Sequence, residues 1–247
     1  MREVLLITGG SRGIGAATVR LAARAGQVVA FSYREARDAA HALCDEVAAF
    51  GGEAHAFRAD VASESDILQL FTEVDHLGTL KGLVNNAGIA ERQTRLVDMD
   101  LARLRRVFET NLIGSMLCAR EAVKRMSTRL GGSGGGIVNV SSAASRLGSP
   151  GEYVDYAASK GGLDTFTLGL AKEVALEGIR VNAVRPGLIY TDIHDSYGDP
   201  TRVERLQGNV PMQRGGTAEE VAEAILWLLS PAASYCIANF IDVSGGR

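Results

Sequence analysis

Short apolar runs alternate with longer amphipathic stretches along the whole chain. Seven runs have the length and composition of strands, namely EVLLIT, QVVAFSY, EAHAFRAD, LKGLVNNAG, GIVNVSS, IRVNAVRPG and FIDVSGG. Helical patterns lie between most of them, and this alternation is typical of repeated βαβ units, which place helices on both faces of a parallel sheet. The pattern therefore predicts a doubly wound α/β fold with seven parallel strands.

One helical pattern is unusually long. Between Asp98 and about Leu130, apolar residues recur at helical spacing, at Leu101, Leu104, Phe108, Leu112, Ala119, Val123 and Met126. A stripe that faces the core is sufficient to explain them. The segment GGSGGG, 131–136, has the composition of a linker, but a buried-type strand begins at once, so we predict a surface turn within one domain spanning residues 1–247.

Composition narrows the class of protein. The chain has 247 residues, of which 46% are hydrophobic and 22% charged, enough for one large domain. The net charge of -3 argues against a surface for nucleic acid or anionic membrane. Cys44, Cys118 and Cys236 are widely separated without a CxxC pair, which indicates neither a disulfide framework nor a metal site. The first apolar run is too short for a signal peptide or a membrane span, and we predict a cytoplasmic protein.

A glycine-rich turn follows the first predicted strand. It reads TGGSRGIG, from Thr8 to Gly15, and leads into the helical pattern AATVRLAARAG. Gly9, Gly13 and Gly15 would let backbone amides and the positive end of the helix approach a pyrophosphate without obstruction by side chains. The spacing is GxxxGxG, not the common GxGxxG, so a plain glycine-rich turn is the alternative.

Polar motifs also follow the later strands, at 59–60 (AD), 85–88 (NNAG), 141–142 (SS) and 185–187 (RPG). In doubly wound folds, ligands bind beyond the carboxyl ends of the strands, near the point where the strand order reverses. The motifs are therefore expected to meet in one crevice.

A tyrosine and a lysine stand four residues apart in VDYAASKGG, 154–162. Residues at this spacing are neighbours on a helix, so Tyr156 and Lys160 can act on the same point in space. The small residues around them leave room for a bulky ligand. The alternative is a surface tyrosine beside a surface lysine.

Together, these motifs resemble the short-chain dehydrogenase/reductase family, in its single-domain branch, over essentially the whole chain. The matching motifs are TGxxxGxG (8–15), NNAG (85–88), ETNLIG with Asn111, a serine in NVSS, YxxxK (156–160) and RPGLIYT (185–191). The stretch SSAASRLGSPGEYVDYAASKGGLD is most similar to bacterial sugar or glucose dehydrogenase-like oxidoreductases. The resemblance implies a Rossmann-type fold and the interconversion of a carbonyl and a secondary alcohol with a nicotinamide cofactor.

The resemblance implies four catalytic residues. Tyr156 would exchange a proton with the substrate oxygen, and Lys160 would lower the pKa of the phenol, which is about 10 when free. Lys160 would also bind the nicotinamide ribose. Ser142 would hold the substrate oxygen. Asn111 would anchor a water that links Lys160 to solvent, with a surface asparagine as the alternative.

Two features depart from the family pattern, and one tyrosine could be confused with the proposed base. The gap from Ser142 to Tyr156 is one residue longer than usual, which leaves Ser141 as a rival for Ser142. Tyr153 could be mistaken for the base, but its neighbour one turn on is Ala157, which cannot tune a pKa. Before the last strand the family commonly has Thr-Gly, whereas this chain has Ile and Ala at 237–238, which leaves the form of the local turn open but does not affect the chemistry.

The end of the second predicted strand bears on the choice of cofactor. Sites that select NAD place a carboxylate there, which binds the ribose and repels a 2′-phosphate. In this chain Tyr33 occupies that position and Arg34 follows it. With Arg12 of the glycine loop, Arg34 could clamp a 2′-phosphate, so we predict that NADP(H) is preferred over NAD(H). The alternatives are a pair of exposed arginines, or Glu35 serving the ribose if the strand ends later.

The predicted cofactor site comprises the glycine loop, the ends of later strands and the helix with the tyrosine. Its residues are Thr8, Gly9, Ser11, Arg12, Gly13, Ile14, Gly15, Tyr33, Arg34, Asp60, Val61, Asn86, Ala87, Gly88, Tyr156, Lys160, Pro186, Gly187, Ile189 and Thr191. The substrate is expected to lie against 145–152 and against a loop at about 188–208. That loop contains Tyr190, His194 and Tyr197, with a solvated histidine as the alternative for His194.

Three rival functions share parts of this pattern. An epimerase or dehydratase of the extended branch needs a larger substrate domain, and an enoyl reductase separates its tyrosine and lysine by more residues. A catalytically silent, nucleotide-sensing protein on the same fold is the alternative from another class. We also predict a homotetramer, partly from the family resemblance. The predicted helices that contain Asn111 and Tyr156 are apolar over more turns than one sheet face needs, and EAILWLLSP with FIDVSGG offers a second apolar surface.

Overall fold

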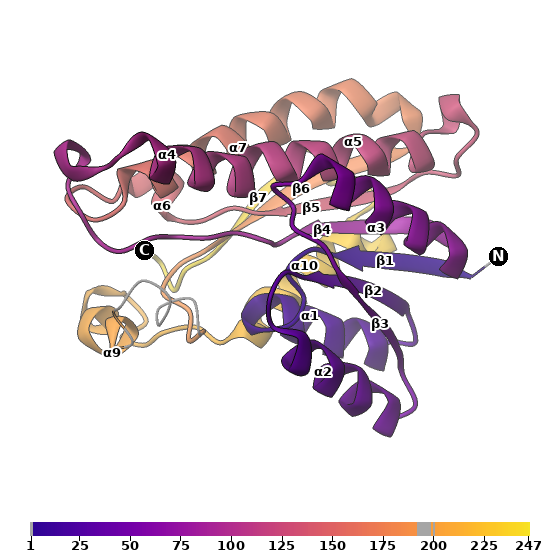
Figure 1. Ribbon diagram of the computed structural model, residues 1–247, viewed down its shortest axis with the longest axis horizontal. Coiled ribbons are helices and arrows are strands. Elements are labelled where there is room, and N and C mark those ends of the chain that lie inside the picture. The colour runs from indigo at the N-terminus through magenta and orange to yellow at the C-terminus, as the bar shows by residue number, and fades with distance from the viewer. Residues whose placement is uncertain (1, 192–198, 200) are drawn as a thin grey trace.

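The fold is described by a computed structural model that covers residues 2–191, 199 and 201–247 (Figure 1). All seven predicted strands are present in one parallel sheet. Their bounds are β1 (Glu3–Ile7), β2 (Val28–Tyr33), β3 (Glu53–Arg58), β4 (Thr79–Asn85), β5 (Gly135–Val140), β6 (Ile179–Pro186) and β7 (Phe240–Val243). The order in the sheet is β3-β2-β1-β4-β5-β6-β7. The order reverses between β1 and β4, and a ligand crevice is expected at their carboxyl ends.

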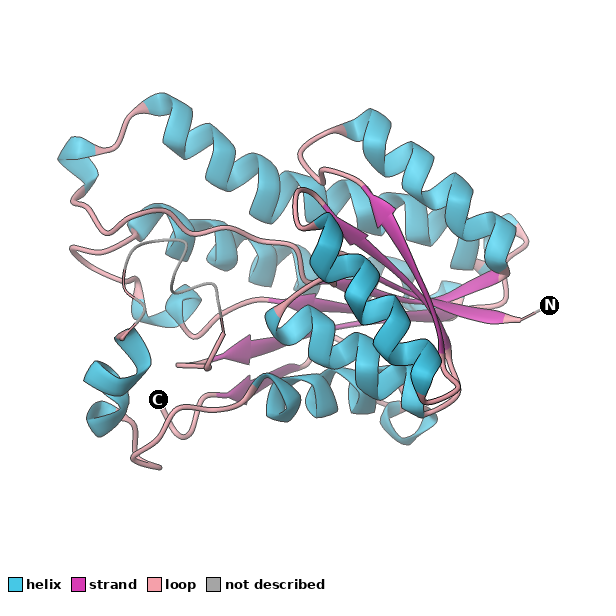
Figure 2. Ribbon diagram, turned by 60° about the horizontal axis from the view of Figure 1, so that its bottom comes forward, coloured by secondary structure: helices cyan, strands magenta, loops and turns pink. Residues whose placement is uncertain are grey.

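Helices cover both faces of the sheet (Figures 1 and 2). They are α1 (Gly13–Arg24), α2 (Arg37–Ala49), α3 (Glu64–Leu77), α4 (Leu101–Phe108), α5 (Gly114–Met126), α6 (Ala144–Leu147), α7 (Val154–Val174), α9 (Arg202–Leu206) and α10 (Ala218–Leu229). One core layer joins α3, α5 and α7 to the sheet through residues such as Ile67, Cys118 and Ala171. The other joins α1, α2 and α10, for example through Val19, Leu43 and Ile225. Two buried apolar layers around one sheet confirm the doubly wound class.

The long helical pattern after Asp98 is not one continuous α-helix. It begins at Leu101, widens into a π-turn at Glu109–Ile113 and resumes as α5. Asn111 lies in the widened turn, where its side chain binds the backbone of Ile89. The predicted core-facing stripe is only partly correct: Ala119 and Met126 are buried, whereas Leu101 is exposed, because the π-turn adds a residue and shifts the face that packs on the core.

The turn before β7 keeps the backbone that the family's glycine would favour. Ala238 has φ 55, and its N–H donates to Val181 O at 2.8 Å. The substitution of alanine therefore leaves this feature of the turn intact, because the hydrogen bond to β6 holds Ala238 in the left-handed region. Such a conformation costs a non-glycine residue on the order of 1 kcal/mol.

No helix within residues 2–191 and 201–247 is long and apolar enough to cross a membrane.

Arg180 of β6 reaches the end of α10 instead of solvent. Its guanidinium donates to the carbonyl oxygens of Leu228, Leu229, Ser230 and Ala233, at 2.6–3.3 Å. A cation at the carboxyl end of a helix stabilises both the dipole and the unpaired carbonyls, so Arg180 fastens α10 to the sheet.

We expect Arg180→Ala to lower the free energy of unfolding by about 3 kcal/mol, since a hydrogen bond to a charged group contributes about 1.5–3 kcal/mol and several are lost. The measurement is denaturant unfolding followed by circular dichroism at one protein concentration. Arg95→Ala, at an exposed loop position, is the control and should change little. Equal stability of the two variants would contradict the role of Arg180.

Candidate active site

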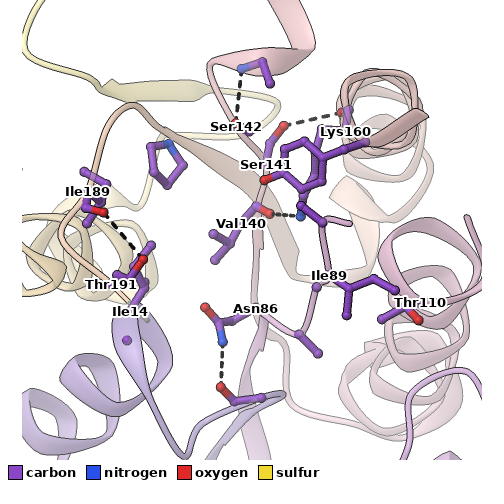
Figure 3. Close-up of a pocket in the computed structure, with 18 of the residues that line it drawn as sticks. Ile14, Asn86, Ile89, Thr110, Val140, Ser141, Ser142, Lys160, Ile189 and Thr191 are labelled. Atoms are coloured by element: carbon purple, nitrogen blue, oxygen red, sulfur yellow. Dashed lines mark hydrogen bonds between the residues drawn. The ribbon is translucent and has the colours of Figure 1, made fainter. Parts of the chain in front are cut away.

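A cavity of about 660 Å³ opens at the carboxyl ends of the strands, where the order reverses. Nearly all of the predicted site residues line it (Figure 3). These are Gly9, Ser11, Arg12, Gly13, Ile14, Tyr33, Arg34, Asp60, Val61, Asn86, Ala87, Gly88, Ser142, Tyr156, Lys160, Pro186, Gly187, Ile189 and Thr191. Thr8, Gly15 and Asn111 do not line the cavity, but each contacts a segment that does.

The glycine loop between β1 and α1 depends on two close approaches of the backbone. Gly9 has φ 64, and a Cβ there would lie 2.9 Å from the Cα of Ala87. A Cβ on Gly15 would collide with the carbonyl oxygen of Gly9. The loop therefore presents bare backbone and the free N–H groups of the first turn of α1 to the cavity, a cradle that fits a pyrophosphate.

The two asparagines of NNAG, Asn85 and Asn86, form hydrogen bonds on different sides of the loop. Asn86 Nδ2 donates to the carbonyl oxygens of Thr8 and Gly9, both at 2.9 Å (Figure 3). Thr8 Oγ1 in turn accepts from the N–H groups of Asn86 and Ala87 at 3.0 Å. Asn85 points into the core, where its amide donates to Asn139 Oδ1 at 2.9 Å. The loops after β1 and β4 thus form one hydrogen-bonded unit across the crevice.

Tyr156 and Lys160 lie on one face of α7, as the spacing predicted. The Lys160 ammonium is 5.7 Å from the centre of the Tyr156 ring. It donates to Val140 O of β5 at 2.8 Å (Figure 3). Lys160 is buried, and burial lowers its pKa to about 8. A buried charge on the wall of a cavity excludes the interpretation of a plain surface pair.

The expected lowering of the Tyr156 pKa by Lys160 is not observed. Burial raises the pKa of this phenol, and a hydrogen bond with the Ser142 side chain lowers it in part. Desolvation disfavours the phenolate, and the Lys160 ammonium, which is bound to the Val140 carbonyl, does not offset that effect. Tyr156 is therefore a neutral proton donor near neutral pH.

The two serines after β5 point in different directions (Figure 3). Ser141 is buried, and its hydroxyl donates to the backbone oxygen of Lys160 at 3.4 Å. Ser142 Oγ accepts from the N–H of Ala144 at 3.1 Å and faces the Tyr156 hydroxyl. Of the two, Ser142 has the position that a group holding a substrate oxygen needs.

Tyr153 also borders the cavity, with its ring edge-on to that of Tyr156 at 6.0 Å. The guanidinium of Arg202 lies 5.1 Å from the centre of the Tyr153 ring. Burial raises the pKa of this phenol. No lysine stands one turn beyond Tyr153, since that position is Ala157. Tyr153 therefore forms a wall of the cavity and is poorly suited to act as a base.

Asn111 is fully buried, which excludes the surface interpretation. Its Oδ1 accepts from Ile89 N at 2.8 Å, and its Nδ2 donates to Ile89 O and to Ser159 Oγ. A Cβ on Gly88 would lie 3.3 Å from Asn111 Oδ1 and 3.4 Å from Lys160 Nζ. The side chain thus fastens the segment after β4 close beside the lysine.

The small residues on α7 have a second cause besides room for a ligand. A Cβ on Gly162 would lie 2.9 Å from the Leu112 side chain, which packs on α7 from the π-turn. The interpretation that the small residues serve the ligand alone is therefore wrong for Gly162.

The end of β2 lies where the sequence predicted it. The strand ends at Tyr33, so Glu35 is two residues beyond it. Arg34 is half-exposed and forms an ion pair with Glu35 at 2.9 Å. Arg12 is exposed at the start of α1. Arg58, at the end of β3, pairs with Tyr33 across the sheet and donates to Arg34 O at 3.4 Å, a third cation that the motif comparison missed.

The segments expected at the substrate contribute to the same cavity. Leu147, Ser149, Pro150 and Glu152 follow β5, and Leu188, Arg202 and Leu206 come from the loop at 188–208. Tyr190 is not among the described lining residues and binds Gln207 instead, while His194 and Tyr197 fall outside the described residues. Sequence reasoning missed Ile89 and Ala90, which directly follow NNAG, Thr110, which precedes Asn111, and Arg247, which reaches the cavity through tertiary packing.

Comparison with known proteins places the chain in a family. The family model described as "Enoyl-(Acyl carrier protein) reductase" matches residues 9–247. An uncharacterized oxidoreductase, YgfF, of Escherichia coli (strain K12) is 55% identical over 99% of both chains. The 3-oxoacyl-[acyl-carrier-protein] reductase of Homo sapiens is 41% identical over 100% of this chain and 98% of its own length.

Solved structures agree with the sequence comparison. A blue fluorescent protein from a metagenomic library, in complex with NADPH, is 33% identical and has a TM-score of 0.90 over 99% of this chain and 97% of its own. A short-chain dehydrogenase/reductase of Serratia marcescens, solved as a double mutant, has the same TM-score at 31% identity and the same coverage. The chain therefore belongs to the short-chain dehydrogenase/reductase family, and it is an NAD(P)-dependent oxidoreductase that interconverts carbonyl and alcohol groups.

Proposed function

We propose that the protein is an NADPH-dependent reductase of a small ketone or 3-oxoacyl substrate, with Tyr156 as its proton donor. One observation carries the proposal: the Tyr156 hydroxyl faces Ser142, beside a buried Lys160, on the wall of a cavity that continues to the glycine loop. The names of relatives that reduce 3-oxoacyl groups on a carrier protein support the substrate class. Resemblance to sugar dehydrogenases makes sugars the other substrates to test.

Each side chain of the site has a separate role in the proposed reduction of a carbonyl group. When bound, the nicotinamide supplies the hydride to the carbonyl carbon. Ser142 donates a hydrogen bond to the carbonyl oxygen and holds it within reach of Tyr156. The phenol, kept neutral by burial, transfers its proton to that oxygen as negative charge develops there. Lys160 stabilises the phenolate that remains, and the segment fastened by Asn111 keeps the lysine in place.

The preference for NADPH rests on charge at the end of β2. No carboxylate occupies the Tyr33 position; Arg12 and Arg34 line the same cavity as Tyr33, and Arg58 lies next to Tyr33 on the neighbouring strand. The ion pair with Glu35 is exposed and therefore weak, so Arg34 can exchange it for a 2′-phosphate. The NADPH complex of a relative with the same fold is consistent with this choice. A silent nucleotide-sensing protein is not favoured, because tyrosine, lysine and serine are all in place.

We propose a homotetramer in the cytoplasm. Exposed apolar residues lie in two regions on opposite faces of the sheet. One comprises Ile113, Met116 and Leu168 on the π-turn, α5 and α7, and the other comprises Trp227, Tyr235 and Ile237 near α10 and β7. Two self-complementary surfaces on one chain are what a tetramer with two kinds of two-fold interface requires.

Tyr156→Phe should lower turnover about a hundredfold to ten-thousandfold, the usual contribution of a general acid, with little change in NADPH affinity. Turnover is followed by NADPH absorbance with ketone and 3-oxoacyl thioester substrates, and affinity by NADPH fluorescence. Ser142→Ala should be far more damaging than Ser141→Ala, which is the matched control. Near wild-type turnover by Tyr156→Phe would contradict the assignment of the acid.

The ratio of kcat/KM with NADPH to that with NADH should exceed about tenfold in the wild type, since each charged hydrogen bond to a 2′-phosphate contributes about 1.5–3 kcal/mol. Arg34→Ala should lower the ratio by weakening the binding of NADPH alone, with Arg12 and Arg58 left in place. Arg37→Ala, at the exposed start of α2, is the control. A ratio that Arg34→Ala leaves unchanged, or a wild-type preference for NADH, would overturn the proposal.

Light scattering after size exclusion should give four times the mass of 26.1 kDa at micromolar concentration. Met116→Glu, which places a charge on one apolar region only, should yield dimers because the second region is untouched. A monomeric wild type would refute the proposed assembly.

A further inference from the structure

A buried ion pair lies one helical turn beyond the catalytic lysine. Asp164 follows Lys160 by four residues on α7, and its Oδ2 accepts from Arg185 Nε at 3.0 Å and from Nη2 at 2.9 Å. Arg185 lies near the end of β6, directly before Pro186, a residue of the cavity wall. Both side chains are largely buried, with 16% of Arg185 and 12% of Asp164 exposed.

The pair is not explained by hydrogen bonding alone. Asp164 Oδ1 is buried and has no hydrogen-bond partner among the described residues. A buried carboxylate with one oxygen unsatisfied is costly, and two apolar residues of similar size would often be more stable. A neutral pair could join α7 to β6 at a lower cost in free energy. A structural role therefore does not explain why residue 164 carries a negative charge.

Lys160 is the charged group of the active site that this carboxylate can influence. Burial lowers the lysine pKa to about 8, and the charge of Asp164 acts in the opposite direction. The other groups that face Lys160 are the Tyr156 phenol, the Val140 carbonyl, Ser141 and neutral Asn111, which are uncharged at neutral pH. Behind Asp164 stand Arg185, then Asp242 at 3.9 Å from it, and then Arg146 at 3.2 Å from Asp242.

We propose that Asp164, held by Arg185, is a positioning residue that keeps Lys160 protonated beside Tyr156. The inference rests on the proposed function, because it explains how the positive charge of Lys160, which serves the proposed proton donor Tyr156, is maintained. Arg185 holds the carboxylate in place and also cancels part of its charge. The two residues therefore act on Lys160 with opposite signs.

Removal of either charge should shift the protonation of Lys160, in opposite directions. Asp164→Asn removes the negative charge and leaves Arg185, so the lysine and the phenol lose protons at lower pH. Arg185→Met leaves the carboxylate without its counter-charge, so both groups hold their protons to higher pH. Because reduction needs a protonated phenol and a charged lysine, the alkaline limb of the pH profile should move down in the first variant and up in the second.

The experiment records kcat/KM for ketone reduction, and NADPH affinity by fluorescence, from neutral to alkaline pH. We expect the alkaline limb of Asp164→Asn about one pH unit below that of the wild type and the limb of Arg185→Met above it, as is usual for a charge of either sign nearby. The double variant, which removes both charges, should have a limb between those of Asp164→Asn and the wild type, because the charge of Asp164 acts on Lys160 more strongly than that of Arg185. Arg185→Lys, which keeps the charge, should stay close to the wild-type limb.

A merely structural pair would behave differently. Both single variants would then lose stability and activity at every pH, with limbs unmoved or moved in the same direction, and the double variant would not be rescued. Either result overturns the proposal. Failure of the proposed function is a separate observation, since it would show as a Tyr156→Phe variant that still turns over, whatever the limbs of the Asp164 and Arg185 variants do.

Discussion

The hydrogen bonds from Asn86 to the backbone of Thr8 and Gly9 hold the active site together, because they close the sheet at the point where its strand order reverses. Parallel strands on either side of such a point send their connections in opposite directions, which opens a crevice. Through these bonds the glycine loop is joined to the segment after β4, which passes Gly88 beside Lys160 and is bound at Ile89 by Asn111.

Burial of the site is the second constraint, because it shifts the pKa values of both Tyr156 and Lys160. Exclusion of water raises the pKa of the Tyr156 phenol, and the same exclusion works against the charge on Lys160. The fold offsets that cost with the carbonyl of Val140 and a carboxylate one turn away. A surface lysine would keep its proton with no such help, but it would then act through water, where one charge affects another only weakly.

Much of the fold and of the candidate site was predictable because the information is local in the sequence. Strand positions follow from periodicity, the glycine turn and the Tyr156–Lys160 spacing are short local motifs, and the roles expected of these residues came from the resemblance of the motifs to the family. The π-turn, the packing of Leu112 on Gly162 and the raised pKa of Tyr156 were not predictable, since each depends on elements that meet only in the folded chain. The same holds for the ion pair of Asp164 and Arg185, whose members are 21 residues apart.

The same distinction explains why the sequence predicts the reaction better than the substrate. The groups proposed to react lie directly after β5 and on α7, within short continuous motifs. The far wall of the cavity is assembled from the segment after β4, the stretch before α7, α9 and the C-terminal residue. An ion pair joins two of these pieces, since Arg202 Nη2 of α9 binds the Glu152 carboxylate at 2.6 Å. Substrate shape therefore depends on how several distant segments pack, and a change in any one of them alters the wall while leaving the chemistry of Tyr156 intact.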